Sequence, residues 1–435
     1  MNEELHLSQV TLNKKVTLGL SSYQFMAMAR RGLFYTFLSL YLMAGLGLSV
    51  TATTLLASLS MITNSVSQTF VWGKISDKYR IRARLVIIGE TIAAFGYVLI
   101  YFLHVHLLNT VGSVAAAYSI IAGLTLLEFF WSMSNLGWSA LLSDVSTSKE
   151  RGRLMSVVSS VGGIGRIVGI SVSGALYNWG GDAGGFRNGI LFLFPSVIML
   201  TSALLIWFSM RFSEQNCGNE RADEAVLEEK TTHSRGYGSR AFYWFLASIS
   251  IVSLGTYSIL QILTFYVNLD SPIGATTFDI AMIGNSASIA TIIFSLLAGP
   301  LADKIGRKNA LSLGFALSVI TPVLYIFAQN ALQMIIINSL SGISMAIVTV
   351  VGYLMASDLI PAKRRGRLFG QYNAVTSVSF GIAGTVIGGP IADYMIATGA
   401  TNAAAYVATF QAASIISLIG MIMFVLKVKS GSLDG

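Results

Sequence analysis

Charged residues are scarce in this sequence. They make up 11% of its 435 residues, whereas a typical soluble protein carries about 25%. Cysteine is almost absent, and Cys217 alone excludes an intramolecular disulfide and gives no metal-site spacing. The four histidines are scattered and no nucleotide-binding loop is present. We therefore expect no metal, no cofactor and no enzymatic activity, and an ATP-driven pump is disfavoured.

Hydrophobic residues, in contrast, make up 54% of the chain, and the mean hydropathy is +0.69. They come in blocks of about 20, the length that a helix needs to cross a bilayer. No cleavable signal precedes the first block, because residues 1–15 are polar. The sequence therefore predicts an all-α polytopic membrane protein. We expect twelve transmembrane helices, near residues 17–45, 51–72, 85–103, 114–142, 154–178, 189–210, 241–268, 279–298, 310–328, 332–356, 368–391 and 403–426.

Basic residues are distributed unevenly between the connections. Alternate connections, beginning with residues 1–16, hold 24 of the 28 Lys and Arg residues, and the opposite side holds Arg187 alone. By the positive-inside rule, both termini lie in the cytoplasm, and we expect the protein in the plasma membrane. Topology thus explains the net charge of +8, and we expect no nucleic acid as a partner.

The two halves of the chain repeat each other. GKISDK (73–78) recurs as GPLADK (299–304), and SDVSTSKERGRL (143–154) recurs as SDLIPAKRRGRL (357–368), at matching places in the order of the spans. Parallel repeats of this kind occur in one large class of secondary transporters. The sequence therefore predicts two six-helix bundles, residues 1–211 and 241–435, joined by a polar cytoplasmic linker at 212–240.

The second copy of the shorter repeat carries a family resemblance. GPLADKIGRK resembles, at every position, the signature Gly-x-x-x-Asp-(Arg/Lys)-x-Gly-Arg-(Arg/Lys) of the major facilitator superfamily. The first copy has Arg80 for the second Gly and Ile81 for the Arg, so either Arg80 or Arg82 replaces that Arg. The resemblance covers essentially the whole chain. It implies two bundles related by a pseudo-two-fold axis along the membrane normal, which rock against each other in the lipid bilayer; we expect a monomer.

Aspartates recur at matched positions in the cytoplasmic connections of both halves. Topology explains the Lys and Arg residues there but not these carboxylates. The resemblance implies that Asp77 faces the start of span eleven, near Arg367, and small residues would let the helices approach closely. We expect a gate of ion pairs, each contributing about 0–1 kcal/mol; the alternative is that the charges serve topology alone. The gate residues are Gly73, Asp77, Arg82, Asp144, Arg151, Arg153, Gly299, Asp303, Arg307, Lys308, Asp358, Arg365 and Arg367.

Five ionisable residues lie inside apolar spans: Arg30, Arg31, Glu90, Glu128 and Arg166. A charge at the bilayer centre costs at least ~2.5–3.5 kcal/mol, so such residues usually line a cavity or pair. Glu128 and Arg166 resemble the substrate site of the lactose permease type. Burial favours a neutral carboxyl and a nearby cation favours its ionised form, so Glu128 is a candidate for proton coupling; the alternative is a static ion pair.

The other three ionisable residues have more than one interpretation. Arg30 and Arg31 suit either an anionic substrate or a structural role, and we expect Glu90 to pair with an Arg of the cytoplasmic loop. Polar residues also share helix faces on spans four and seven. The resemblance implies that spans one, four, seven and ten surround a central cavity. The candidate residues for substrate or proton binding are Glu128, Arg166, Arg30, Arg31, Asn135, Tyr257 and Gln261.

Three functions compete. A secondary active transporter of a small organic solute leads, with a polar or anionic solute favoured and proton coupling as a candidate mechanism. A multidrug/proton antiporter is the close alternative; that branch carries a Pro-containing Gly-rich motif on span five, whereas GGIGRIVGISVSG (162–174) lacks the Pro and contains Arg166. A transporter-like receptor would carry long signalling tails, and only residues 427–435 follow the last expected span.

Overall fold

A computed structural model describes residues 14–79, 82–144, 148–214, 239–360 and 365–428. These residues form helices and short connections and contain no strand. Helices satisfy their backbone groups internally, which a segment inside lipid requires. The prediction of twelve membrane-spanning segments is confirmed within the described residues. The segments are α1 (Lys14–Leu40) with η1 (Tyr41–Gly45); α2 (Val50–Ser67), η2 (Gln68–Trp72) and α3 (Gly73–Tyr79); α4 (Arg82–Thr110); α5 (Ser113–Asp144); α6 (Ser148–Tyr177); α8 (Ile190–Glu214); α9 (Ser239–Ser258) with α10 (Leu260–Val267); α11 (Thr277–Ile305); α12 (Arg307–Phe327); α13 (Ala331–Leu359); α14 (Arg365–Ala383), η4 (Gly384–Gly388) and α15 (Gly389–Ala397); and α16 (Asn402–Lys427).

Ten of these described segments are long and apolar enough to cross a membrane by length and composition. The other two are the first, which contains Arg30 and Arg31, and the second, which is interrupted by the π-helical turn η2. Large hydrophobic side chains lie exposed on the outer surfaces of the helices, for example Leu99, Leu296 and Leu426, each about 70% exposed. Such a surface suits a lipid environment.

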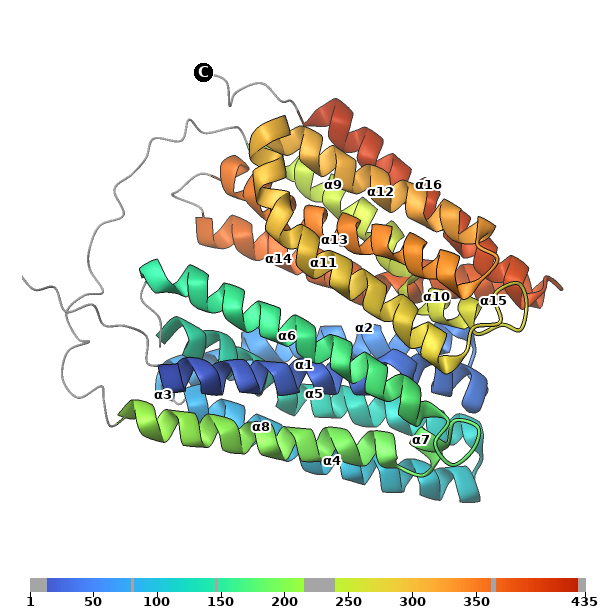
Figure 1. Cartoon of the computed structure of the whole chain (residues 1–435), viewed down its shortest axis with the longest axis horizontal. Helices are drawn as coiled ribbons and strands as arrows, with labels where there is room; N and C mark the ends of the chain where they lie inside the picture. The colour runs from blue at the N-terminus through green and yellow to red at the C-terminus, as the bar shows by residue number, and fades with distance from the viewer. Residues whose placement is uncertain (1–13, 80–81, 145–147, 215–238, 361–364, 429–435) are drawn as a thin grey trace, which may run out of the picture.

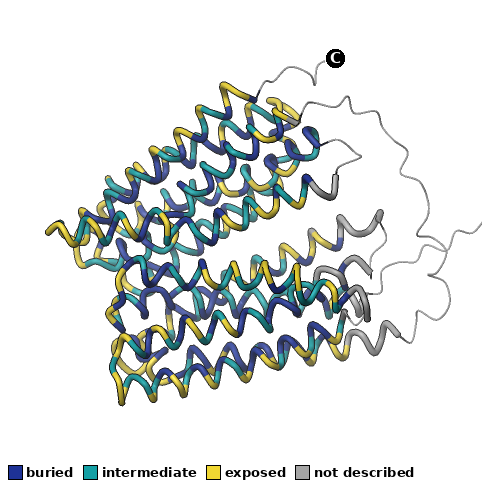
Figure 2. The backbone as a smooth tube through the Cα atoms, turned by 180° about the vertical axis from the view of Figure 1, so that it is seen from behind, coloured by how far each residue is buried: buried dark blue, intermediate teal, exposed yellow. Residues whose placement is uncertain are grey.

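The helices form two bundles that meet at one end (Figure 1). Helices α1–α8 make the first bundle and α9–α16 the second, and Figure 2 shows the same arrangement from behind. At the end that we call the closed end, α10 and α15 lie close to the first bundle, and the short helix α7 (Gly184–Arg187) connects α6 to α8. Toward the opposite end, which we call the open end, the bundles diverge. The predicted linker, residues 212–240, lies mostly outside the described residues.

Glycines allow close packing inside the first bundle. A Cβ at Gly165 would lie 2.3 Å from the backbone oxygen of Phe25, and one at Gly169 would lie 2.0 Å from that of Ala29. Helices α1 and α6 therefore touch backbone to backbone, as small residues permit in membranes. The Gly-rich stretch on span five thus acts in helix packing.

The connections at the open end are shorter than the sequence predicts. Helix α3 continues the second span to Tyr79, and α11 runs to Ile305, so most of the expected connections 73–84 and 299–309 are helical. A helix that leaves the apolar layer keeps its backbone hydrogen bonds, and charged side chains at its end do not break it. Gly306 alone separates α11 from α12, and its φ of 84° and ψ of 143° belong to a region that is nearly restricted to glycine. The second Gly of GPLADKIGRK is thus explained by backbone geometry.

The first Gly of each copy does not mediate close helix contact here. A Cβ at Gly299 would meet no atom within 4 Å, and one at Gly73 would meet only the Gln68 carbonyl of its own span. The expectation that both glycines let two helices approach is therefore wrong for this structure. The physical reason is that the bundles diverge at this end, so neighbouring helices are not pressed together.

We predict that Gly306→Ala lowers the free energy of unfolding by about 1–2 kcal/mol, because a Cβ is disfavoured at this positive φ. The unfolding temperature of the purified protein measures the effect. Gly370→Ala is the matched control: Gly370 lies inside α14 with open space around its Cα, so the change should be neutral or slightly stabilising. Equal unfolding temperatures for the two variants would contradict the prediction.

Candidate functional site

Glu90 on α4 is enclosed in the first bundle. Its side chain is 1% exposed, and its Oε1 accepts hydrogen bonds from the Tyr23 hydroxyl (3.0 Å), the Trp131 indole N–H (3.0 Å) and the Ser134 hydroxyl (2.7 Å). The Ser202 hydroxyl approaches Oε2 at 3.4 Å. In the described part of the chain its partners are thus neutral donors from other spans. The expected pairing with a loop Arg involves Arg80 or Arg82, whose side chains lie outside the described residues, so it stays a prediction; the described partners come from α1, α5 and α8.

Arg30 and Arg31 occupy different environments although they are adjacent in sequence. Arg30 is 1% exposed, and its Nη1 donates to the Tyr97 hydroxyl at 2.8 Å. Arg31 is only half-buried. Both guanidinium groups lie close to the Trp131 ring, at 4.4 and 4.5 Å from its centroid, distances that give cation–π attraction. Trp131 therefore joins the enclosed Arg30–Glu90 region to the more accessible Arg31.

Glu128 contacts the second span rather than the fifth. It is 6% exposed, and Asn64 on α2 donates its amide N–H to Oε1 at 2.6 Å. Gln68 in turn donates to Asn64. Arg30 and Arg31 both pack on the ring of Trp131, three residues after Glu128 on α5.

Arg166 lies apart from Glu128. No ion pair joins the two side chains among the residues that the structure describes. The reason is the packing of their helices, since α6 lies along α1 and α11 whereas α5 lies along α4 and α2. The structure therefore does not bring together the two residues whose combination the sequence favours.

Arg166 faces the other bundle. Its side chain is exposed although it lies in the middle of a membrane span. On α6, the exposed residues Val157, Ile164 and Val168 mark the outer face, and the spacing of a helix places Arg166 opposite them. It lies between the face that packs on α1 and the face where Gly163 meets Ile292 of α11. A charge in this place is directed at the facing surfaces of the bundles and away from lipid.

The second bundle presents neutral polar and aromatic residues. Tyr257 on α9 is half-buried, and its ring contacts Phe380 edge-on at 4.9 Å. Gln261 on α10 has a buried Oε1 without a hydrogen-bond partner in the described residues. Asn135, on α5 of the first bundle, is half-buried and engaged with other residues. The candidate residues thus form a charged wall on one side and a neutral wall on the other.

An aspartate of the second bundle caps a helix of the first at the closed end. The two carboxylate oxygens of Asp393 on α15 accept hydrogen bonds from the backbone N–H groups of Val50 and Thr51, each at 2.9 Å. These are the first amides of α2, which have no acceptor within their own helix. The partial positive charge of the helix terminus strengthens the contact. We call this contact the Asp393 cap.

Small and hydroxyl residues continue the seam from the Asp393 cap. The Ser58 hydroxyl donates to the Gly381 carbonyl at 2.7 Å, and the Thr385 hydroxyl donates to the Thr54 hydroxyl at 3.1 Å. On the other side of the molecule, the Asn285 amide of α11 donates to the Ser171 hydroxyl of α6 at 2.9 Å. These described contacts lie in the parts of α2, α6, α11 and α14 that are nearer the closed end.

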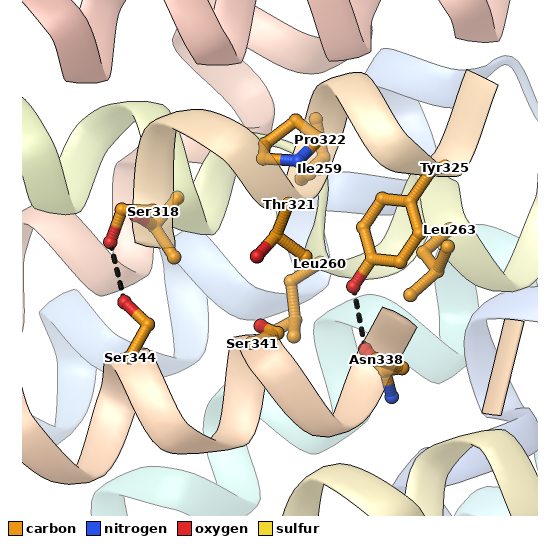
Figure 3. Close-up of a pocket in the computed structure, with 11 residues that line it drawn as sticks. Ile259, Leu260, Leu263, Ser318, Thr321, Pro322, Tyr325, Asn338, Ser341 and Ser344 are labelled. Atoms are coloured by element: carbon orange, nitrogen blue, oxygen red, sulfur yellow. Dashed lines mark hydrogen bonds between the residues drawn. The ribbon is translucent and has the colours of Figure 1, made fainter. Parts of the chain in front are cut away.

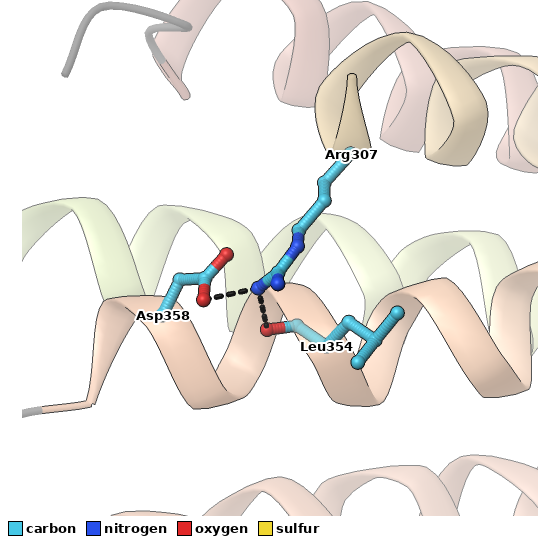
Figure 4. A network of polar contacts seen from close by, with 3 residues as sticks. All are labelled: Arg307, Leu354 and Asp358. Carbon is cyan, nitrogen blue, oxygen red and sulfur yellow. Dashed lines mark hydrogen bonds and ion pairs between the residues drawn. The ribbon is translucent and has the colours of Figure 1, made fainter. Parts of the chain in front are cut away.

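At the open end, the signature charges that the structure describes stay within one bundle. Arg307 at the start of α12 forms an ion pair with Asp358 near the end of α13, and its Nη1 also donates to the Leu354 carbonyl at 3.2 Å (Figure 4). Lys308 donates to the Val425 carbonyl of α16 at 2.9 Å. Asp303 is exposed, and no partner for it occurs among the described residues. The side chains of the remaining expected gate residues lie outside the described part: Asp77, Arg82, Asp144, Arg151, Arg153, Arg365 and Arg367.

Comparison with known proteins identifies the family. The family model of the Major Facilitator Superfamily matches residues 20–278 and 269–432, nearly the whole chain. The chain belongs to this superfamily. A transporter of the superfamily crosses the membrane several times and acts on small molecules, and this accounts for the two bundles and for their facing surfaces.

Its relatives within the superfamily are named for diverse functions. A Lactococcus lactis subsp. lactis (strain IL1403) protein, the multi-drug resistance efflux pump PmrA homolog, is 21% identical over 82% of this chain and 84% of its own length. The Escherichia coli (strain K12) inner membrane metabolite transport protein YgcS is 29% identical over 27% of this chain and 26% of its own. The crystal structure of the nucleoside transporter NupG has a similar fold, with a TM-score of 0.67 and 16% identity, covering 94% of this chain and 99% of that one.

Sequence reasoning missed three residues of the site. Asn64 donates a hydrogen bond to Glu128, Trp131 contacts the arginines of α1, and Asp393 joins the two bundles. For Asn64 and Trp131, the sequence offers only a polar or an aromatic residue within an apolar span. For Asp393 the sequence offers only a carboxylate just after the expected end of span eleven.

We predict that Glu90→Gln destabilises the first bundle by about 1–3 kcal/mol, because three donors then compete for a neutral amide and Arg30 loses a compensating charge. Thermal unfolding of the purified protein measures this. Ser171→Ala, which removes a hydroxyl from the interface of the bundles, is a control for a general loss of polar contacts. An unfolding temperature for Glu90→Gln equal to that of the parent would refute the stabilising role of Glu90.

We predict that Asp393→Asn opens the closed end. The Asn side chain has one acceptor oxygen where the Asp carboxylate has two, so one backbone N–H at the start of α2 loses its acceptor. The negative charge that the helix N-terminus favours is also lost. Distance distributions between spin labels at exposed positions on α7 and α15 measure the separation of the bundles, with a larger share of long distances expected. Asp279→Asn, at the start of α11 within the second bundle, is the control. Identical distributions for the parent and Asp393→Asn would contradict a role of the Asp393 cap in holding the bundles together.

Proposed function

We propose that this superfamily member is a secondary active transporter of a polar or anionic organic solute, which binds between the facing surfaces of its two bundles. The observation that carries the proposal is the exposed Arg166 in the middle of α6, directed at the second bundle and away from lipid. An uncompensated arginine in a membrane span is costly, which favours a functional role. A bound anion would offset this cost.

The charges nearby favour an anion over a cation. Arg31 is half-buried on the same side of the first bundle, and Glu128 is engaged by Asn64. A planar guanidinium binds carboxylate or phosphate through two parallel hydrogen bonds, which gives geometric specificity as well as affinity. Tyr257 and Gln261 on the opposite wall would supply neutral hydrogen-bonding groups.

Rocking of the bundles is the proposed mechanism of alternating access. The described contacts between bundles gather at the closed end, and they consist of one carboxylate cap, hydroxyl contacts and small residues. They lie beside buried apolar residues of both bundles, and polar contacts of this kind can break and form again as the bundles rock. The positive-inside distribution favours placing the open end in the cytoplasm and both termini there, in a plasma membrane. We further propose that the chain works as a monomer with the domain boundaries expected from its sequence.

Proton coupling is assigned to Glu128. Its carboxyl accepts a hydrogen bond from Asn64, and Arg31 packs on Trp131, three residues farther along α5, so a change at Arg31 alters how strongly the ionised form of Glu128 is favoured. Substrate binding to Arg31 would weaken that stabilisation and promote proton uptake by Glu128. Substrate and proton would then move together.

Efflux of drugs is the second candidate function. The relative that is named as a multi-drug resistance efflux pump aligns with 82% of this chain, which supports this alternative. Against it stand the missing Pro in the Gly-rich stretch of α6 and the exposed Arg166, which repels the cationic drugs that such pumps commonly carry. The two candidates differ in the charge of the transported molecule.

Uptake into proteoliposomes tests the proposal. A thermal-shift screen of sugars, carboxylates, phosphate esters and lipophilic cations selects ligands, and uptake of a selected anion is then measured with and without a pH gradient. We predict that Arg166→Gln lowers anion uptake at least about tenfold, because the charged contact is lost, and that Glu128→Gln abolishes acceleration by the gradient.

Arg187→Gln is the matched control, since Arg187 is an exposed arginine in a connection at the closed end. Uptake that is unchanged in Arg166→Gln would refute the anion assignment. Transport of a lipophilic cation that survives this substitution would favour drug efflux instead, and gradient-driven uptake by Glu128→Gln would refute the coupling assignment.

A further inference from the structure

A fissure runs between two helices of the second bundle. We define the α9–α13 fissure as two connected hollows that share Thr256, Ser318 and Ser344. The larger hollow has an empty volume of about 400 Å³, including the part open to solvent. Figure 3 shows its lining residues, which come from α9, α10, α12 and α13: Thr256, Ile259, Leu260, Leu263, Ser318, Thr321, Pro322, Tyr325, Asn338, Ser341 and Ser344.

The fissure opens toward the first bundle. Its floor is formed by α12, through Ser318, Thr321 and Tyr325. At its mouth, Leu260 is 52% exposed and Met345 is 42% exposed. On α13, Met345 lies opposite the outer face that carries the exposed Ile336. The mouth therefore belongs to the same facing surface as Tyr257, across from the wall that carries Arg166.

A break in span seven shapes the mouth of the fissure. Helix α9 ends at Ser258, Ile259 departs from helical geometry with φ −104° and ψ 0°, and α10 begins at Leu260. The break turns Leu260 outward to the mouth, while Ile259 stays buried at 5% exposure. Interrupted helices near the middle of the membrane commonly mark binding sites in transporters.

Several polar groups of the fissure are already hydrogen-bonded within the protein. The hydroxyls of Ser318 and Ser344 bond to each other at 2.7 Å, and the Tyr325 hydroxyl donates to Asn338 Oδ1 at 2.7 Å (Figure 3). The Thr256 hydroxyl donates to the Val252 carbonyl at 3.0 Å. A ligand would therefore form few hydrogen bonds here. The remaining surface consists of side-chain carbons without any charged residue, so it favours an apolar ligand.

We infer that the α9–α13 fissure binds the apolar body of the transported solute, while its acidic group contacts Arg166 of the first bundle. The substrate class is then an amphipathic organic anion with one acidic group and an aromatic ring or a short hydrocarbon chain. The inference rests on the proposed function, because it assigns the two ends of the solute to the two walls of the same site. It also makes closure around the solute dependent on both bundles, since each bundle holds one end.

Binding of three carboxylates of increasing ring size tests the inference. The affinities of acetate, benzoate and 2-naphthoate are measured on the purified chain in phospholipid nanodiscs. We expect affinity to rise at least about tenfold from acetate to 2-naphthoate, because more apolar surface enters the fissure. Thr256→Phe, which fills the space shared by both hollows, should reduce this ratio at least fivefold, about 1 kcal/mol. Thr256→Val, which keeps the volume, should preserve it, and Ile336→Phe on the outer face of α13 is the control for an added ring.

The outcomes separate the inference from the proposed function. Arg166→Gln should weaken all three anions by a similar factor. If the anions bind without a gain from the ring, or if the gain survives Thr256→Phe, the fissure assignment is overturned while the proposed function stands. Failure of every anion to bind overturns both. Equal affinity for 2-naphthoate and the neutral 2-naphthylmethanol would overturn the role of the acidic group. If 2-naphthoate binds in detergent but not in nanodiscs, a lipid chain occupies the fissure instead of the solute.

Discussion

Two backbone amides at the start of α2 find their acceptor on the other bundle. Asp393 satisfies both N–H groups and places a negative charge at the positive end of the helix. The arrangement of the whole molecule depends on this seam, since the bundles meet around it and diverge from it (Figure 1). A directional contact of this kind holds its partners in register while it is formed. It is also small enough to break and form again, as the proposed rocking of the bundles requires.

The first bundle separates its buried charges into two layers around Trp131. On the enclosed side, hydroxyl and indole groups donate to Glu90, and Arg30 donates from Nη1 to Tyr97, while its Nε and Nη2 have no hydrogen-bond partner among the described residues. On the accessible side lie Arg31 and Glu128. The enclosed layer fixes the orientation of Trp131, and Trp131 in turn holds Arg31 through its ring. Near the fissure, the described residues of the second bundle form no such layers and offer hydroxyl groups and carbon surface instead. A solute with one acidic end and one apolar end matches this difference between the walls.

Much of the architecture could be predicted from local features of the sequence. The lengths of the apolar blocks, the sidedness of Lys and Arg and the repeated GPLADK and SDLIPAKRRGRL motifs each depend on a few neighbouring residues. The partners of Glu90 could not be predicted in this way, because Tyr23, Trp131 and Ser202 are 67, 41 and 112 residues away. The Asp393 cap joins residues 343 and 342 apart, so no spacing in the sequence indicates it.

The sequence by itself determined the class of protein, the twelve spans, the duplication and the family signature, because a bilayer of fixed thickness accepts only helices of a given length with satisfied backbones. Only the tertiary structure decided which side chains meet. Lipid is as apolar as a packed helix surface, so hydrophobicity does not tell which face of a span turns inward. Because spans four and five are adjacent, the sequence suggests Glu128 and Arg166 as partners. In the structure α5 packs on α2, so Glu128 bonds to Asn64, and Arg166 faces the other bundle.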